Sequence, residues 1–205
     1  MLKTLILRLL NFTRIPSLIV SALELQNLIQ CNNQVLNRGG HFLQKANVTN
    51  LSGKVSNIVI GKETVVCANL LVFSYGGKII LGENTYVGEG TRIWSGASIT
   101  VGNNVLISHN VNIMDSNAHE IDYLERMDSY LDFKKNGHPK EIGSVQASPI
   151  TIDDHVWIGF NATILKGVSI GRGAIIAAGT IIVKDVPPFV MMGGNPARIL
   201  KHLTS

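Results

Sequence analysis

The sequence predicts a parallel β-helix, a fold in which short strands wind into a coil and each turn stacks on the next. Aliphatic residues recur every six residues, a period that fits neither an α-helix nor an alternating strand. The next position is small in many repeats, and Thr, Ala or Val follows three positions later. A short strand plus a tight turn explains this unit, and three units make one triangular coil that buries its face only against its neighbours. The aliphatic positions are Leu81, Val87, Ile93, Ile99, Val101, Ile107, Ile113, Ile152, Ile158, Ile164, Ile170, Ile176 and Ile182.

The repeat defines the main domain, which we expect to span residues 51–205. A weaker set of repeats begins near Ile60, and the pattern is interrupted once, between Met114 and Ile150. The predicted insertion covers residues 115–149, and an insertion of this length inside a compact domain is typical of a functional loop. Glycines such as Gly82 follow the aliphatic residue, and we expect them to adopt turn conformations that a Cβ forbids.

Residues 1–50 are expected to form a helical extension. The segment from residue 2 to residue 28 is rich in Leu and Ile, and Pro16 would break or kink a helix there. No uninterrupted apolar run approaches the ~18–20 residues that a membrane-spanning helix needs. The segment therefore packs on the main domain, or alternatively lies on a membrane surface. In the second case, its basic side chains would face the headgroups: Lys3, Arg8 and Arg14.

Composition excludes several classes of protein. The chain has 205 residues, of which 45% are hydrophobic and 16% are charged, so it is not a disordered chain. The net charge of +4 comes without a long basic run, which argues against nucleic-acid binding but suits a phosphorylated small ligand. The two cysteines, Cys31 and Cys67, form no CxxC pattern, so we expect neither a disulfide framework nor a zinc knuckle. A reducing cytoplasmic location fits this cysteine usage.

The repeat and the C-terminal sequence together resemble the hexapeptide-repeat acyltransferases. The similarity covers roughly residues 55–202 and includes residues 179–188 and 193–198, which look like the coenzyme-binding end of that family. Within the family, the chain is most similar to the galactoside, maltose and capsular-polysaccharide O-acetyltransferases. The resemblance implies a left-handed β-helix with a short C-terminal helix, assembled as a homotrimer with active sites between subunits. It also implies transfer of an acetyl group from acetyl-CoA to a sugar hydroxyl, without a metal. If the N-terminal segment lies on a membrane, the cytoplasmic location expected from the cysteines places the protein at the inner face of that membrane.

His119 is the predicted catalytic base. Transfer to a hydroxyl requires removal of its proton as the oxygen attacks, and a neutral imidazole suits this task near pH 7. His119 stands where the repeat gives way to the insertion, and relatives place their catalytic histidine at this junction. Asp115, four residues earlier, is expected to orient the imidazole or to bind a substrate hydroxyl. Glu120 and Asp122 are weaker candidates.

The coenzyme site is predicted from the same resemblance. Trp157 is expected beside the pantetheine arm, and subunit packing is an equally good explanation of this residue. Phe160 stands where the galactoside enzymes have Ser, and the small Ala178 allows the arm to approach the backbone. Phosphate groups call for basic side chains. The residues predicted to hold the phosphates, or for the first of them a carbonyl, are Lys184, Arg198 and Lys201.

The acceptor contacts do not carry over from the relatives. Two positions that are Asn in some relatives are Gly88 and Gly90 here. Side chains from the same stretch can serve instead, namely Glu89, Arg92 and Trp94. His109 is expected to face outward from its repeat, either towards the cleft between subunits or simply at the surface.

Three other functions compete with this interpretation. A zinc enzyme of the γ-class carbonic anhydrase type needs three histidines, two of them five positions apart, and position 114, five from both His109 and His119, is Met. A non-catalytic scaffold would lack the junction histidine and the coenzyme-binding end, both of which are present. An N-acetyltransferase acting on a nucleotide-linked amino sugar stays open, because a histidine base serves both reactions.

Overall fold

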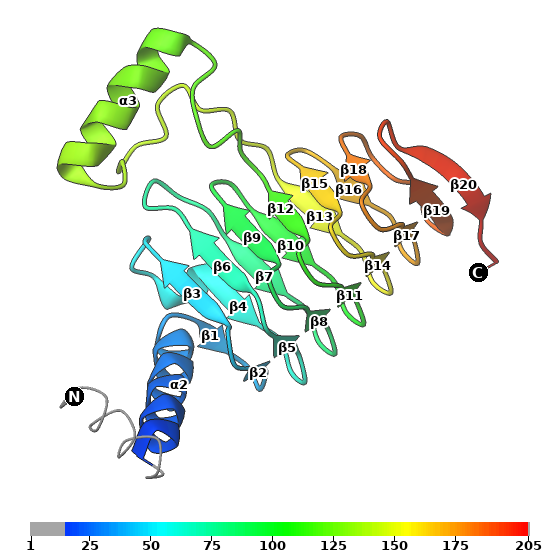
Figure 1. Cartoon of the computed structure of the whole chain (residues 1–205). Coiled ribbons are helices and arrows are strands. Elements are labelled where there is room, and N and C mark those ends of the chain that lie inside the picture. The colour runs from blue at the N-terminus through cyan, green and yellow to red at the C-terminus, as the bar shows by residue number, and fades with distance from the viewer. Residues whose placement is uncertain (1–14, 205) are drawn as a thin grey trace, which may run out of the picture.

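The computed structural model describes residues 15–204, which form a left-handed parallel β-helix (Figure 1). Three strands make one coil, and six coils stack so that each side of the triangular prism is a parallel sheet. The left-handed turn departs from the general right-handed rule for parallel crossovers. The predicted fold class is thereby confirmed.

Each coil contributes one strand to each of three sheets. Sheet A runs through β1 (Leu36–Asn37), β4 (Ile58–Ile60), β7 (Ile79–Leu81), β10 (Ile99–Val101), β13 (Ile150–Ile152) and β16 (Ser169–Ile170). Sheet B runs through β2 (His41–Phe42), β5 (Val65–Val66), β8 (Tyr86–Val87), β11 (Leu106–Ile107), β14 (Trp157–Ile158), β17 (Ile175–Ile176), β19 (Val190–Gly193) and β20 (Arg198–His202). Sheet C runs through β3 (Asn47–Asn50), β6 (Asn69–Val72), β9 (Arg92–Ser95), β12 (Asn112–Met114), β15 (Thr163–Leu165) and β18 (Ile181–Ile182).

The aliphatic repeat forms the core as predicted. Equivalent residues of successive coils are paired in register, so that in sheet B the column runs from Val87 to Ile107 and on to Ile158. All thirteen aliphatic positions of the repeat are at most 1% exposed. The pattern works because each inward side chain packs on the same kind of side chain one coil away, and such contacts reward close packing.

The glycines after the aliphatic residues have a different role from the one expected. Gly82 does not have a positive φ; the left-handed residue of that turn is Asn84, at φ 52°. A Cβ on Gly82 would lie 2.3 Å from the carbonyl oxygen of Gly102 in the next coil. Glycine is therefore required for the close approach of successive turns, and Asn, which tolerates positive φ, occupies the left-handed position.

The β-helix begins earlier than the predicted boundary at residue 51. Residues 36–50 were expected within the helical extension, but they form the first coil and pair with the second. Helix α2 (Ile15–Asn33) covers the open end of that coil, where Cys31 is buried and Asn27 Nδ2 donates to the carbonyl oxygen of Ala46 at 2.8 Å. The predicted membrane contacts Lys3, Arg8 and Arg14 lie outside the described residues. Within residues 15–204, no helix is both long and apolar enough to cross a bilayer.

The insertion between β12 and β13 contains a helix that stands away from the coils. Helix α3 (Tyr123–Asn136) has no buried residue, and Figure 1 shows it beside the prism rather than on it. The carboxylate of Asp122 caps its first turn by accepting from the backbone N–H groups of Leu124 and Glu125, and Gly137 ends it at φ 80°. Its boundaries therefore come from local capping rather than from packing.

The C-terminal segment corrects one prediction. A short helix was expected after Pro196, but residues 198–202 form β20, which runs antiparallel to β19. The strand covers the last edge of sheet B with paired backbone groups, a common way to protect a sheet edge. A short 3-10 turn, η1 (Val55–Asn57), completes the regular elements.

Candidate functional site

The predicted functional residues fall on two different corners of the prism. We call the turns that lead from sheet B to sheet C the B–C corner, and those from sheet C to sheet A the C–A corner. Asp115 and His119 follow β12, and Lys184 follows β18, so all three lie at the C–A corner. Trp157 belongs to sheet B, and Phe160 lies at the B–C corner of the same coil. Sheet C separates the two groups within one chain.

At the C–A corner, Asp115 is a buried carboxylate with a full set of hydrogen bonds. Its Oδ1 accepts from Gly96 N at 2.7 Å, and its Oδ2 accepts from Ala97 N at 3.0 Å and pairs with Ser95 Oγ at 2.6 Å. Burial raises the pKa of Asp115, while these hydrogen bonds act in the opposite direction. The carboxylate thus binds the turn of the preceding coil. His119 is not among its hydrogen-bond partners, so the structure does not bring these two predicted residues together as a pair.

His119 lies just beyond the base of the insertion. This base is a short antiparallel ladder, in which Ser116 bridges Ala147 and Asn117 N donates to Gln146 O at 2.9 Å. Ala118 follows in the left-handed region at φ 62°, and its N–H donates to the hydroxyl of Ser116 at 3.3 Å. The imidazole of His119 is exposed. The ladder at the start of the insertion and the turn at Ala118 therefore hold the backbone in place, and His119 lies on the outside of the prism.

Glu120, the residue after His119, is held by contacts with helix α3. Its carboxylate accepts from Ser129 Oγ of α3 at 2.6 Å, and this hydrogen bond lowers the pKa of Glu120. Arg126 of α3 donates to the carbonyl oxygens of Glu120 and Ile121 at 2.8 and 3.0 Å. These contacts connect α3 to the segment that carries His119. Asp122 is used as the cap of α3, as described above.

The B–C corner carries a strip of small residues between two rows of larger ones. The strip consists of Gly88, Ser108, Gly159 and Ala177, which follow the paired strands of sheet B in successive coils. The row on sheet B is Tyr86, Leu106 and Trp157, which are 41–53% exposed. The row on the other side is Glu89, His109, Phe160 and Ala178, in which the rings of His109 and Phe160 stack at 5.3 Å with an interplanar angle of 2°. Three of the predicted coenzyme residues therefore lie along one corner: Trp157, Phe160 and Ala178.

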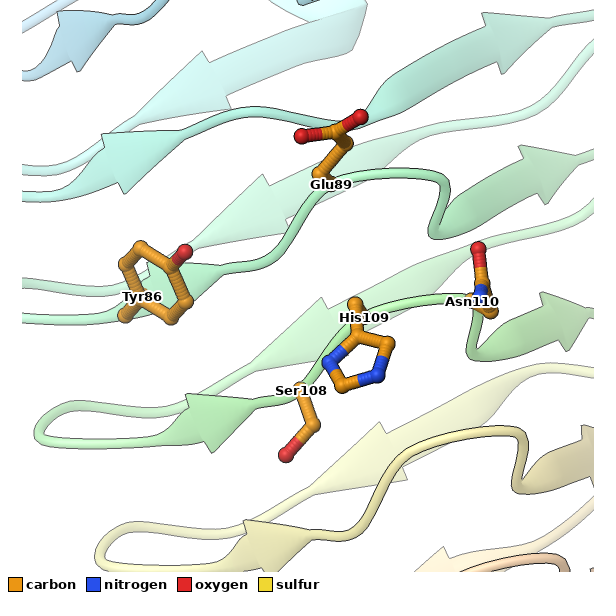
Figure 2. Close-up of a pocket in the computed structure, with 5 residues that line it drawn as sticks. All are labelled: Tyr86, Glu89, Ser108, His109 and Asn110. Carbon is orange, nitrogen blue, oxygen red and sulfur yellow. The ribbon is translucent and has the colours of Figure 1, made fainter.

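The N-terminal end of this strip opens into a pocket of about 470 Å³. We call it the corner pocket; it belongs to the third and fourth coils and is lined by Tyr86, Glu89, Ser108, His109 and Asn110 (Figure 2). In Figure 2, the carboxylate of Glu89 points away from His109. It forms an ion pair with Lys45 of the first coil, with Nζ 2.6 Å from Oε1.

The basic residues predicted for phosphate binding are exposed but dispersed. Lys184 lies at the C–A corner two coils after the insertion, and Arg198 and Lys201 lie on β20 at the far end of sheet B. Arg198 pairs with Gly193, which continues the small-residue strip. A single chain therefore places Arg198 and Lys201 at the end of the B–C corner, and Lys184 on another corner.

Sequence reasoning missed the ion pair between Lys45 and Glu89. Lys45 and Glu89 are 44 residues apart, and no local pattern links them before the coils are aligned. Trp94 is half-buried in sheet C, and Arg92 is exposed there, with its guanidinium 3.2 Å from Asn112 Oδ1. Among residues 15–204, no three His, Cys, Asp or Glu side chains lie close enough together to hold a metal ion.

Comparison with known proteins is consistent with this architecture. The family model for the hexapeptide repeat of succinyl-transferase matches residues 149–184. The chain is 40% identical over 73 residues to the protein YJL218W of Saccharomyces cerevisiae. It is 52% identical over 56 residues to a 2,3,4,5-tetrahydropyridine-2,6-dicarboxylate N-acetyltransferase of Staphylococcus aureus. The matched regions cover 33% and 27% of this chain, and 37% and 23% of the lengths of those relatives.

Solved structures extend the similarity over most of the chain. A hexapeptide-repeat acetyltransferase of Vibrio cholerae, solved with acetyl-coenzyme A, is 29% identical with a TM-score of 0.56, covering 73% of this chain and 72% of that one. A galactoside acetyltransferase solved with coenzyme A is 26% identical with a TM-score of 0.57, covering 85% and 68% of the two chains. An N-acyltransferase of Bacillus cereus, at 18% identity and a TM-score of 0.64 over 84% and 86%, shares the fold. The resemblance to the hexapeptide-repeat acetyltransferases is thus confirmed.

Proposed function

We propose that this chain, which has the fold and the repeat of the hexapeptide-repeat acetyltransferases, transfers an acetyl group from acetyl-CoA to a sugar hydroxyl. We further propose that it works as a homotrimer. In this assembly, the C–A corner of one protomer faces the B–C corner of the next. Each of the three interfaces then holds one active site, and the ring closes because the same heterologous contact is used three times.

The observation that carries this proposal is the division of the candidate residues between two corners. One chain has the histidine on one side of sheet C and the predicted coenzyme residues Trp157, Phe160 and Ala178 on the other. If the copies are related by a threefold axis parallel to the axis of the β-helix, equivalent coils of the three chains lie at the same level. His119, which follows the fourth coil, then meets the fourth-coil part of the neighbouring B–C corner. The exposed apolar side chains of Leu106, Trp157 and Phe160 supply a surface for this contact.

The proposed path of the coenzyme follows the B–C corner. The pantetheine arm lies along the small-residue strip, where no bulky side chain blocks its approach to the backbone. The phosphates lie towards the C-terminal end, with Arg198 and Lys201 of one protomer and Lys184 of its neighbour as cationic partners. The thioester then reaches the region between Trp157 in the fifth coil and the histidine that the neighbouring chain places at the level of the fourth coil.

In the proposed reaction, His119 acts as a general base. The acceptor hydroxyl oxygen attacks the thioester carbonyl carbon while the imidazole takes the hydroxyl proton. The tetrahedral intermediate collapses by breaking the carbon–sulfur bond, and the imidazolium returns the proton to the departing thiolate of coenzyme A. The chain's own contribution is to hold base, thioester and acceptor in line.

The test combines calorimetry with thiol release. His119→Ala should bind acetyl-CoA as tightly as the wild type, yet lose acetyl transfer by about 10²- to 10⁴-fold, the range for removal of a general base. Arg198→Ala should weaken acetyl-CoA binding instead. Wild-type turnover in His119→Ala would remove this residue from the mechanism. Absence of acetyl-CoA and coenzyme A binding by the wild type would favour a scaffold over an enzyme.

A further inference from the structure

We propose that the corner pocket binds the acceptor as a neutral, hydroxyl-bearing saccharide, and that the Lys45–Glu89 ion pair at its end disfavours phosphorylated and nucleotide-linked acceptors. This inference rests on the proposed function, because the pocket becomes an acceptor site only if acetyl-CoA occupies the same corner. It goes further by choosing between the chemical classes of acceptor that the reaction allows.

The position of the pocket supports an acceptor role. It lies on the same B–C corner as Phe160 and Ala178, but further from Arg198. A coenzyme whose phosphates lie near Arg198 points its thioester towards this pocket. His109 lies between the two regions, since it lines the pocket and stacks on Phe160. An acceptor in the pocket would therefore meet the thioester end of the coenzyme.

A contraction of the second coil sets the shape of the corner beyond the pocket. In the third coil, four residues (88–91) separate the inward Val87 from Arg92, whereas in the second coil only Cys67 and Ala68 separate Val66 from Asn69. The B–C corner is therefore recessed at the second coil. The ion pair between Lys45 and Glu89 crosses this recess, joining the first coil to the third.

The charges of the pocket argue for a neutral ligand. Glu89 supplies the only formally charged side chain of the lining among the described residues, apart from the titratable His109. The lysine at this end of the pocket, Lys45, is paired with Glu89, with Nζ 2.6 Å from Oε1. A phosphate group needs Arg or Lys donors that are not already paired with a carboxylate.

The uncharged lining suits a sugar. The phenol of Tyr86, the hydroxyl of Ser108 and the amide of Asn110 both donate and accept hydrogen bonds, which matches hydroxyl groups. The Tyr86 ring is 41% exposed and offers an apolar surface beside these groups. A saccharide presents both hydroxyls and an apolar ring face, so it can use every part of this lining.

The ion pair can be changed without unfolding the protein. The side chains of Lys45 and Glu89 are 69% and 56% exposed, and ion pairs at such exposure add little to folding stability. Glu89→Gln removes the negative charge and releases Lys45, whereas Lys45→Gln leaves the carboxylate unpaired. The matched control is Glu83→Gln, an exposed glutamate of the same coil at the corner between sheets A and B.

The experiment compares acetyl transfer to methyl glycosides of glucose, galactose and mannose with transfer to the matching sugar 1-phosphates and nucleotide sugars. The wild type should accept at least one neutral glycoside and prefer it to its phosphorylated forms. Glu89→Gln should shift the ratio of kcat/KM towards the phosphorylated acceptor by on the order of tenfold, the effect of one charge-assisted hydrogen bond. Lys45→Gln should shift the ratio the other way, and Glu83→Gln should leave it unchanged.

Calorimetry with acetyl-CoA distinguishes failure of the acceptor inference from failure of the proposed function. A wild-type protein that binds acetyl-CoA but prefers nucleotide-linked sugars, or accepts none of the neutral glycosides, would overturn the inference and leave the proposed function standing. An unchanged ratio in Glu89→Gln would also overturn it. A protein that binds no acetyl-CoA would refute the proposed function itself.

Discussion

At the residue scale, Asp115 shows how a predicted catalytic residue can serve the fold. Its carboxylate satisfies the backbone N–H groups of Gly96 and Ala97 in the turn one coil earlier. In Asp115→Asn, the amide nitrogen must face one of these donors, and a buried N–H without an acceptor costs about 1–3 kcal/mol. We expect this loss in the free energy of unfolding by urea, with acetyl-CoA binding retained. Unchanged stability with abolished turnover would instead make Asp115 a catalytic residue.

The pKa of Asp115 adds a pH dependence to this prediction. Because burial raises the folded-state pKa, the stabilising contribution of Asp115 is fully present below the unfolded value of about 3.9 and is lost as the pH rises through the raised folded-state pKa. Asparagine does not titrate in this range. The stability difference between wild type and Asp115→Asn should therefore widen as the pH falls from about 7 towards about 4. A difference that narrows on acidification would show that the folded-state pKa is lowered rather than raised.

The sequence identifies residues of the repeat more reliably than their partners. Ile107 and Ile158 are recognisable from the period alone, because every coil needs the same inward side chain. The hydrogen bonds of Asp115 to residues 95–97 depend on the length of a coil, and the Lys45–Glu89 pair depends on the contraction of the coil that lies between these two residues. Such contacts become visible only when the coils are aligned in three dimensions.

At the scale of elements, α3 is a helix that contributes little to the stability of the fold. A helix of 14 residues with no buried side chain gains no packing energy, and isolated helices of this length are marginal in water. Its exposed apolar side chains, Tyr123, Leu124, Met127, Tyr130 and Leu131, leave a face available for contacts outside the coils. We therefore expect α3 to act in the assembled active site rather than in the fold.

Replacing residues 123–141 by a short Gly-Ser linker tests this role. The melting temperature and acetyl-CoA affinity should change little, because the coils lose no core side chain. Acetyl transfer should fall at least about tenfold, since His119 loses the support that Glu120 receives from Ser129 and Arg126. A large drop in melting temperature with normal specific activity would assign α3 to the fold instead.

Element types were predictable where the repeat is continuous and not where local signals compete. The strands from β7 to β18 follow from the period. The segment after Pro196 has no such period, and it forms β20 because the exposed edge of β19 offers backbone hydrogen bonds. The first coil, residues 36–50, escaped prediction because the position that pairs with the inward Ile60 is Asn37, and Leu43 rather than a small residue follows Phe42.

At the scale of the whole molecule, the two-corner arrangement predicts that two inactive proteins can restore one another. His119→Ala lacks the base but keeps an intact B–C corner. Ala178→Trp places a bulky side chain beside the small-residue strip but keeps His119, and Ala178 is exposed, so the fold should tolerate the larger side chain. Each variant alone should be nearly inactive. In a mixed trimer, an interface that joins the C–A corner of Ala178→Trp to the B–C corner of His119→Ala contains both intact halves.

The size of the recovery follows from counting interfaces. With equal amounts and random assembly, the required ordered pair arises at about one quarter of the interfaces, so co-refolded mixtures should reach about a quarter of wild-type acetyl transfer. The control is the same mixture prepared without unfolding, in which preformed trimers do not exchange. If co-refolded mixtures form mixed trimers and stay inactive, His119 and the B–C corner that binds the coenzyme belong to the same protomer, and the proposed site between subunits is wrong.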